Sequence, residues 1–146
     1  MIIDSSALIA IARDEPDASR YATAVRDAPS RRISAANWLE ASIVIDRLND
    51  PVTSAIFESI VTRLKLTIEP VTEAQARIAR EAHAKFGRGS GHPARLNFGD
   101  CFAYALAKAL DEPLLYKGDD FSKTDIPFVG RSSERRRLSE LIAAYG

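Results

Sequence analysis

The chain begins Met1-Ile2-Ile3-Asp4-Ser5-Ser6-Ala7-Leu8, where an apolar stretch runs into one aspartate and two serines. The apolar residues predict a short buried strand that ends at Asp4. Ser5 and Ser6 are typical helix-opening residues, so the strand is expected to pass directly into a helix. In sheets whose strands are each followed by a helix, ligands bind at the carboxyl ends of the strands. Asp4 is therefore a candidate site residue.

The rest of the chain alternates between short apolar strands and helical segments. The patterns predict further strands at 32–34, 67–71, 113–116 and 127–129. They predict helices at 5–10, 18–25, 36–48, 51–64, 73–86 and 99–110, and a loop at 87–93. Thr72 followed by Gln75 is a capping box for the fifth of these helices. Alternation of this kind favours an α/β fold with a mainly parallel sheet.

Length and composition restrict the class of protein. The chain has 146 residues, close to one domain, with 46% hydrophobic and 27% charged residues, which excludes a disordered or collagen-like chain. Its 20 basic residues balance its 20 acidic residues. No global positive field therefore attracts nucleic acid or an anionic membrane, and any nucleic-acid contact must come from a local patch.

Cysteine usage and the chain start suggest a location. Cys101 is the only cysteine, which excludes an intramolecular disulfide and fits a reducing compartment. The first residues lack a basic leader, and no apolar run approaches the roughly 18 residues of a membrane span. We expect a cytoplasmic protein that does not enter a membrane.

Three acids stand alone in apolar surroundings. Asp4 is the only charged residue in 1–12, Glu40 in 33–45 and Asp100 in 96–107. A single such acid is usually a helix cap or the partner of a distant arginine. Three are harder to explain in this way, because acids are rarely buried unless they are paired or bind a metal.

The expected structure brings these acids together. Glu40 shares a helix face, expected to be buried, with Ala36, Asn37, Ile43 and Val44. Asp100 falls in the first turn of its helix, and Asp119 comes just after a strand end. Converging carboxylates repel one another, and a hard cation such as Mg²⁺ relieves that repulsion. A bound metal in turn supports attack of water on a phosphodiester.

A basic segment precedes Asp100. Residues 82–99 contain no acid but carry Lys85, Arg88 and Arg95, with Asn97 and Phe98 at their end. The segment is either an ordinary solvated surface or a set of phosphate, polar and stacking contacts for a nucleic acid. Its position beside Asp100 favours the second interpretation.

Other chemistries fit the sequence less well. Aspartate-nucleophile phosphatases carry a second aspartate two residues after the first, where this chain has Ser6. The histidines and Cys101 lack the spacing of zinc ligands. A phosphotransferase that uses Asp4 as nucleophile, and a binding module without catalysis, nevertheless remain alternatives.

Four segments together resemble the motifs of PIN-domain ribonucleases, and most closely those of VapC-type toxins. The segments are Ile2-Ile3-Asp4-Ser5-Ser6-Ala7-Leu8, Trp38-Leu39-Glu40-Ala41, Leu96-Asn97-Phe98-Gly99-Asp100-Cys101 and Leu114-Leu115-Tyr116-Lys117-Gly118-Asp119-Asp120-Phe121. They follow the family's order over residues 1–130. The resemblance implies a three-layer α/β/α sandwich and a Mg²⁺- or Mn²⁺-dependent endoribonuclease. It also implies a homodimer that a VapB-type antitoxin neutralises.

The resemblance also assigns roles to single residues. Asp4, Glu40 and Asp100 match the family's metal-binding acids, and Ser6 matches the small polar residue beside them. The family's usual fourth acid falls at Gly118, which leaves Asp119 or Asp120 as the substitute. We predict a catalytic and metal-binding set of Asp4, Glu40, Asp100 and Asp119 with Ser6, and RNA contacts from Lys85, Arg88, Arg95 and Asn97.

The end of the chain lies outside the resemblance. We predict a nuclease domain at 1–130 and a C-terminal helical tail at 131–146, whose apolar stripe is Leu138, Leu141, Ile142 and Tyr145. Arg135, Arg136 and Arg137 either lie in solvent or contact the RNA backbone or a partner.

Overall fold

The computed structural model describes residues 1–129, and five strands form one parallel sheet through this part of the chain. The strands are β1 (Ile2–Ile3), β2 (Arg32–Ser34), β3 (Thr67–Glu69), β4 (Leu114–Leu115) and β5 (Phe128–Val129). Each predicted strand is present, some of them shorter than expected. The prediction of a parallel sheet is confirmed.

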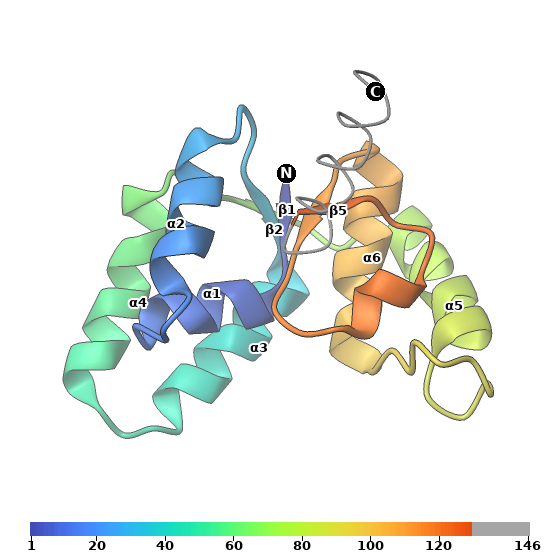
Figure 1. Ribbon diagram of the computed structural model, residues 1–146, viewed down its shortest axis with the longest axis horizontal. Coiled ribbons are helices and arrows are strands. Elements are labelled where there is room, and N and C mark those ends of the chain that lie inside the picture. The colour runs from blue at the N-terminus through green and yellow to red at the C-terminus, as the bar shows by residue number, and fades with distance from the viewer. Residues whose placement is uncertain (130–146) are drawn as a thin grey trace, which may run out of the picture.

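Helices cover both faces of the sheet, as Figure 1 shows. One face packs against α1 (Ser5–Ala12), α2 (Ala18–Asp27), α3 (Ala35–Asp46) and α4 (Pro51–Arg63), and the other against α5 (Glu73–Phe86) and α6 (Phe98–Leu110). Neighbouring strand residues point to opposite faces. Ile3 therefore joins the first core and Ile2 the second. The predicted three-layer α/β/α sandwich is confirmed.

The strand order places a switch point beside β1. The order is β3-β2-β1-β4-β5, so the chain builds outward from β1 to β3 and then returns to the other side of β1 for β4 and β5. Asp4 N donates to Leu115 O at 2.9 Å, which joins β1 and β4 at their carboxyl ends. Ligands of open α/β sheets bind in the crevice at such a point.

Side-chain caps fix where the helices begin. Asp4 caps α1 and Ser34 caps α3, so both helices start directly where β1 and β2 end. Asn97 caps α6. Thr72 caps α5 by accepting from Gln75 N at 3.1 Å, which is one of the two hydrogen bonds of the predicted capping box. These caps place the first turns of α1 and α3 at the carboxyl edge of the sheet.

One prediction about burial is wrong. The helix face that carries Glu40 was expected to be buried, but Ile43 is 44% and Val44 38% exposed. The inner side of α3 consists instead of Asn37, Ala41 and Ile45. Apolar residues surround almost the whole of this helix, so the pattern could not identify the side that the core covers.

Two further predictions concern the C-terminal tail and the membrane. The tail at 131–146 and its boundary lie outside the described residues. None of the helices within residues 1–129 has both the length and the hydropathy needed to cross a membrane.

Candidate active site

The three isolated acids meet at the carboxyl edge of the sheet. Asp4 ends β1, Glu40 comes from α3, and Asp100 lies in the first turn of α6. Asp4 is 3% and Asp100 8% exposed, and Glu40 is half-buried. Their charges influence one another, since Glu40 raises the pKa of Asp4 and Asp4 raises that of Asp100. The sequence-based expectation that they converge agrees with the structure.

Asp4 has one satisfied and one unsatisfied carboxylate oxygen. Its Oδ2 accepts from Ser6 N at 3.0 Å and from Ser6 Oγ at 2.5 Å. Its Oδ1 is buried and has no hydrogen-bond partner among residues 1–129. Burial raises the pKa of Asp4 to about 6, against the lowering effect of the Ser6 hydrogen bonds. Burial of a carboxylate oxygen without a hydrogen-bond partner costs free energy. Such an oxygen is therefore expected where a bound ligand supplies the missing partner.

Asp100 is held by the start of its own helix. Asn97 N donates to Asp100 Oδ2 at 3.0 Å, while Asp100 N donates to Asn97 Oδ1 at 2.8 Å, which forms a capping box. The pKa of Asp100 is raised to about 7, chiefly by burial and also by the charges of Asp4 and Asp120, against the lowering effect of the hydrogen bond from Asn97 N. Asp100 therefore titrates near neutral pH in the absence of a metal.

Glu40 is positioned by neighbours from two other elements. Ser5 Oγ donates to Glu40 Oε1, which links α1 to α3. A Cβ added at Gly99 would overlap Glu40 Oε2, so only glycine leaves room for this carboxylate. Asn37 Nδ2 donates to Gly99 O at 2.9 Å and fixes α6 against α3. Asn37 Oδ1 is buried without a partner in the described residues.

The segment after β4 brings Asp120 rather than Asp119 to Asp100. Both residues are exposed, at the start of the short 3-10 helix η1 (Asp120–Lys123). Asp120 raises the pKa of Asp100 by its charge and by a hydrogen bond between the two carboxyl groups. Asp119 instead accepts from Ser122 Oγ at 2.6 Å with its backbone carbonyl. A role for Asp119 in metal binding stays a prediction, and Asp120 is the better placed acid.

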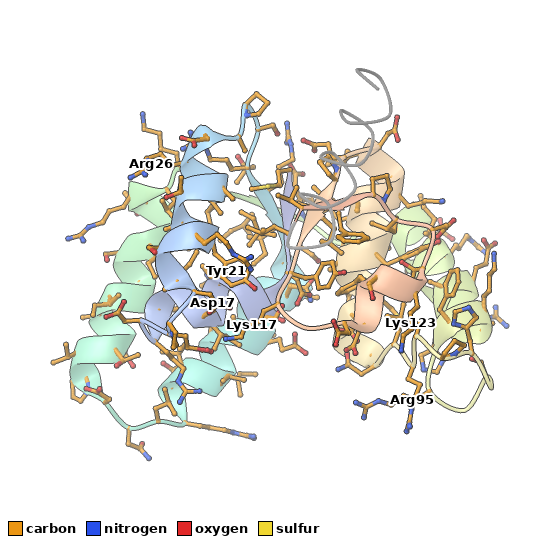
Figure 2. The ribbon with its side chains drawn as sticks, in the orientation of Figure 1. Asp17, Tyr21, Arg26, Arg95, Lys117 and Lys123 are labelled. Atoms are coloured by element: carbon orange, nitrogen blue, oxygen red, sulfur yellow. The ribbon has the colours of Figure 1, made fainter. Side chains whose placement is uncertain are left out.

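Ser6 connects Asp4 to the segment after β4. Its Oγ donates to Asp4 and accepts from Lys117 N at 2.9 Å. Figure 2 shows Lys117 beside Asp17, and its Nζ lies 3.1 Å from Asp17 Oδ1. The same lysine lies 3.3 Å from Glu15 Oε2. Ser6 thus orients the Asp4 carboxylate at the switch point.

The predicted RNA-binding residues lie in the last turn of α5, in the segment between α5 and α6, and at the cap of α6. Lys85, Arg88 and Arg95 are exposed, and none of them forms an ion pair with another residue of 1–129. Arg95 points away from the body at the lower edge of Figure 2. The side-chain oxygen of Asn97 is used to cap α6. Contact of these residues with RNA stays a prediction.

The donor set fits a divalent cation of the Mg²⁺ type. Carboxylate oxygens are its preferred ligands, and Asp4 Oδ1 is a buried acceptor without a partner in the part of the chain described. No group of three Asp, Glu, His or Cys side chains within 1–129 is arranged to hold an ion alone. Mg²⁺ commonly binds through one or two carboxylates, and water and substrate phosphates complete its shell. Asp4 and Asp100 can supply such a pair.

Sequence reasoning missed the roles of Ser5 and Asn37. Ser5 was assigned only to helix initiation, although it also holds Glu40. Asn37 was named only as a neighbour of Glu40 on its helix. The available signal for its structural role was an asparagine in the mostly apolar stretch 33–39, and the structure shows that this amide is fully buried.

Comparison with known proteins agrees with the fold. The family model for the PIN domain matches residues 1–127. Ribonuclease VapC28 from Mycobacterium tuberculosis is 55% identical over 136 residues, which cover 93% of this chain and all of the relative. Ribonuclease VapC from Mycolicibacterium smegmatis is 45% identical over 130 residues, which cover 88% of this chain and 99% of the relative.

Solved structures show the same fold at low identity. A toxin–antitoxin complex from Klebsiella pneumoniae aligns with a TM-score of 0.66 and 17% identity, covering 88% of this chain and 95% of that chain. VapC20 from Mycobacterium tuberculosis, a toxin that cleaves the sarcin–ricin loop, aligns with a TM-score of 0.68 and 16% identity, covering 86% and 95%. The fold is that of a PIN domain. Within that class, the chain belongs to the family of VapC ribonucleases.

Proposed function

We propose that the protein is a toxin that cleaves RNA phosphodiester bonds with Mg²⁺, or Mn²⁺ in its place, held at the carboxylate site. The observation that carries this proposal is the unpaired Asp4 Oδ1 beside Asp100, two buried acids with raised pKa values at the switch point. The names of the relatives, which are ribonucleases, support RNA as the substrate.

We assign a different role to each residue of the site. Asp4 and Asp100 would hold the ion, while Ser6 keeps the Asp4 carboxylate in its orientation. Glu40, which Ser5 holds by a hydrogen bond, would orient a water molecule or accept its proton. When bound, the cation lowers the pKa of water and neutralises charge that develops on the phosphate.

Cleavage of total RNA by the purified protein tests this proposal. We expect cleavage with Mg²⁺, loss in chelator and recovery when Mg²⁺ is added back. Asp100→Asn should abolish cleavage, while Asp27→Asn, a matched change at the exposed end of α2, should leave cleavage unchanged. Full activity in chelator or in Asp100→Asn would refute the proposed mechanism. A phosphorylated Asp4 trapped in the protein would instead identify a phosphotransferase.

We further propose a VapB-type antitoxin as partner and a homodimer as the free state. One solved neighbour is a toxin–antitoxin complex, which supports the first of these. The α3–α4 side also exposes large apolar side chains that a partner helix could cover, namely Leu39, Ile43, Leu48, Val52 and Ile56. Co-expression with the small protein encoded beside it should yield a complex without ribonuclease activity. Failure of the two proteins to co-purify would contradict the proposal.

A further inference from the structure

A second concave site lies between α5 and α6, outside the carboxylate cluster. Its volume is about 240 Å³, and it is lined mainly by Ala79, Arg80, His83, Phe98, Cys101 and Phe102. The lining is almost entirely apolar apart from Arg80 and His83. The cavity therefore offers apolar surface to a ligand, with the charge of Arg80 and the ring of His83 in its lining.

Phe98 forms an open wall of this cavity. It is 78% exposed, the most exposed of the large hydrophobic residues described. Its ring is supported edge-on by Phe102, with 4.9 Å between ring centroids and an 88° interplanar angle. One face of a supported aromatic ring is therefore available to stack on another ring.

The cavity and the carboxylates share the start of α6. Phe98 and Asp100 are two residues apart in the first helical turn. Because each residue turns a helix by about 100°, the two side chains leave the helix on opposite sides. Phe98 faces α5, whereas Asp100 faces Asp4. A bound strand could therefore reach both sites across one turn of helix.

Unpaired cations accompany the cavity. Arg80 lines it, and Lys85, Arg88 and Arg95 belong to the adjoining acid-free segment. None of the four forms an ion pair within the described part of the chain. Aromatic faces beside unpaired cations are the usual components of a single-strand binding site, where bases stack and cations follow the phosphates.

We propose that the α5–α6 cavity binds one unpaired base of the RNA substrate, stacked on Phe98, next to the phosphate that the carboxylate site cleaves. The proposal rests on the proposed function for the identity of the strand. It gives the protein a requirement for single-stranded RNA at the cleavage site, since a paired base cannot enter the cavity. Arg80 contacts the sugar–phosphate backbone at the edge of the cavity.

Binding in chelator tests this site without depending on cleavage. The probes are a fluorescently labelled single-stranded RNA of mixed sequence and an abasic counterpart with the same ribose–phosphate backbone, followed by anisotropy. We expect the wild type to bind the RNA with bases at least ten-fold more tightly than the abasic RNA. Phe98→Ala should reduce this affinity ratio about ten-fold. Phe98→Tyr, which keeps the aromatic ring, should retain the difference in affinity between the two probes. Val52→Ala, at a 68% exposed position on α4, is the matched control and should bind like the wild type.

The outcomes separate this inference from the proposed function. Equal affinity of the wild type for both probes would overturn the base site, even if RNA is cleaved. An equal loss for both probes in Phe98→Ala would also overturn it, because that result indicates a backbone contact. A base-dependent affinity that Phe98→Ala removes supports the site, even in a protein that fails to cleave RNA with Mg²⁺.

Discussion

Asp100→Asn should stabilise the protein in the absence of metal while it abolishes function. In the folded protein the pKa of Asp100 is raised from 3.8 to about 7, chiefly by burial. The folded state therefore binds more protons than the unfolded state between these pH values, and its stability falls as the pH rises through this range. An asparagine carries no charge there. Its amide oxygen can still accept from Asn97 N, so the capping box remains.

The size of the effect follows from the pKa. About three pH units at about 1.4 kcal/mol each give an upper limit near 4 kcal/mol. Because Asp100 retains some contact with solvent and lies beside the exposed Asp120, screening reduces this value. We expect Asp100→Asn to raise the free energy of unfolding by about 2 kcal/mol at about pH 8, and by almost nothing at about pH 4.

Urea denaturation in chelator, followed by fluorescence of the only tryptophan, Trp38, measures this difference. Asp27→Asn is the control, because that carboxylate is exposed at the end of α2. Addition of Mn²⁺ should stabilise the wild type and not Asp100→Asn. A variant that is less stable than the wild type at about pH 8, or a difference that does not change with pH, would refute the reasoning.

Three further changes test other parts of the site. Gly99→Ala should change the free energy of unfolding by no more than about 1 kcal/mol, because the flexible Glu40 side chain can rotate away from the added methyl group. The displaced carboxylate should reduce RNA cleavage about 100-fold. Cleavage at the wild-type rate would contradict the placement of Glu40. Ser6→Ala removes the Oγ hydrogen bond that lowers the pKa of Asp4, while the bond from the backbone N remains, so the pH at which metal-dependent cleavage begins should rise. An unchanged pH–rate profile would exclude this role. Val52→Asp on α4 should weaken the antitoxin complex at least ten-fold in a titration without affecting cleavage, and an unchanged affinity would place the antitoxin elsewhere.

Much of the fold follows from patterns that lie close together in the sequence. The strand at β1, its passage into α1 and the cap at Thr72 each depend on a few neighbouring residues, whose preferences are local. The convergence of Asp4, Glu40 and Asp100 was also predictable, because parallel strands end at a common edge. The exposure of Ile43 was not predictable, because it depends on which side of α3 the rest of the chain covers.

The finer geometry of the site depends on contacts between distant segments. Whether Asp119 or Asp120 faces Asp100 is decided by the turn into η1, which two adjacent aspartates in a sequence do not reveal. The bond from Ser5 to Glu40 joins α1 to α3, and the space for Glu40 is left by Gly99 of α6. The cavity beside Phe98 requires two helices to pack before it exists.

Calorimetric titration of the protein with Mn²⁺, in buffers of different ionisation enthalpy, tests the central claim most directly. The claim is that Asp4 and Asp100, with pKa values raised to about 6 and about 7, bind the ion together. Because the ligands must lose their protons, binding near pH 6.5 should release about one proton per ion, and near pH 8.5 almost none. Binding without proton release near pH 6.5, or unchanged binding by Asp100→Asn, would contradict the account.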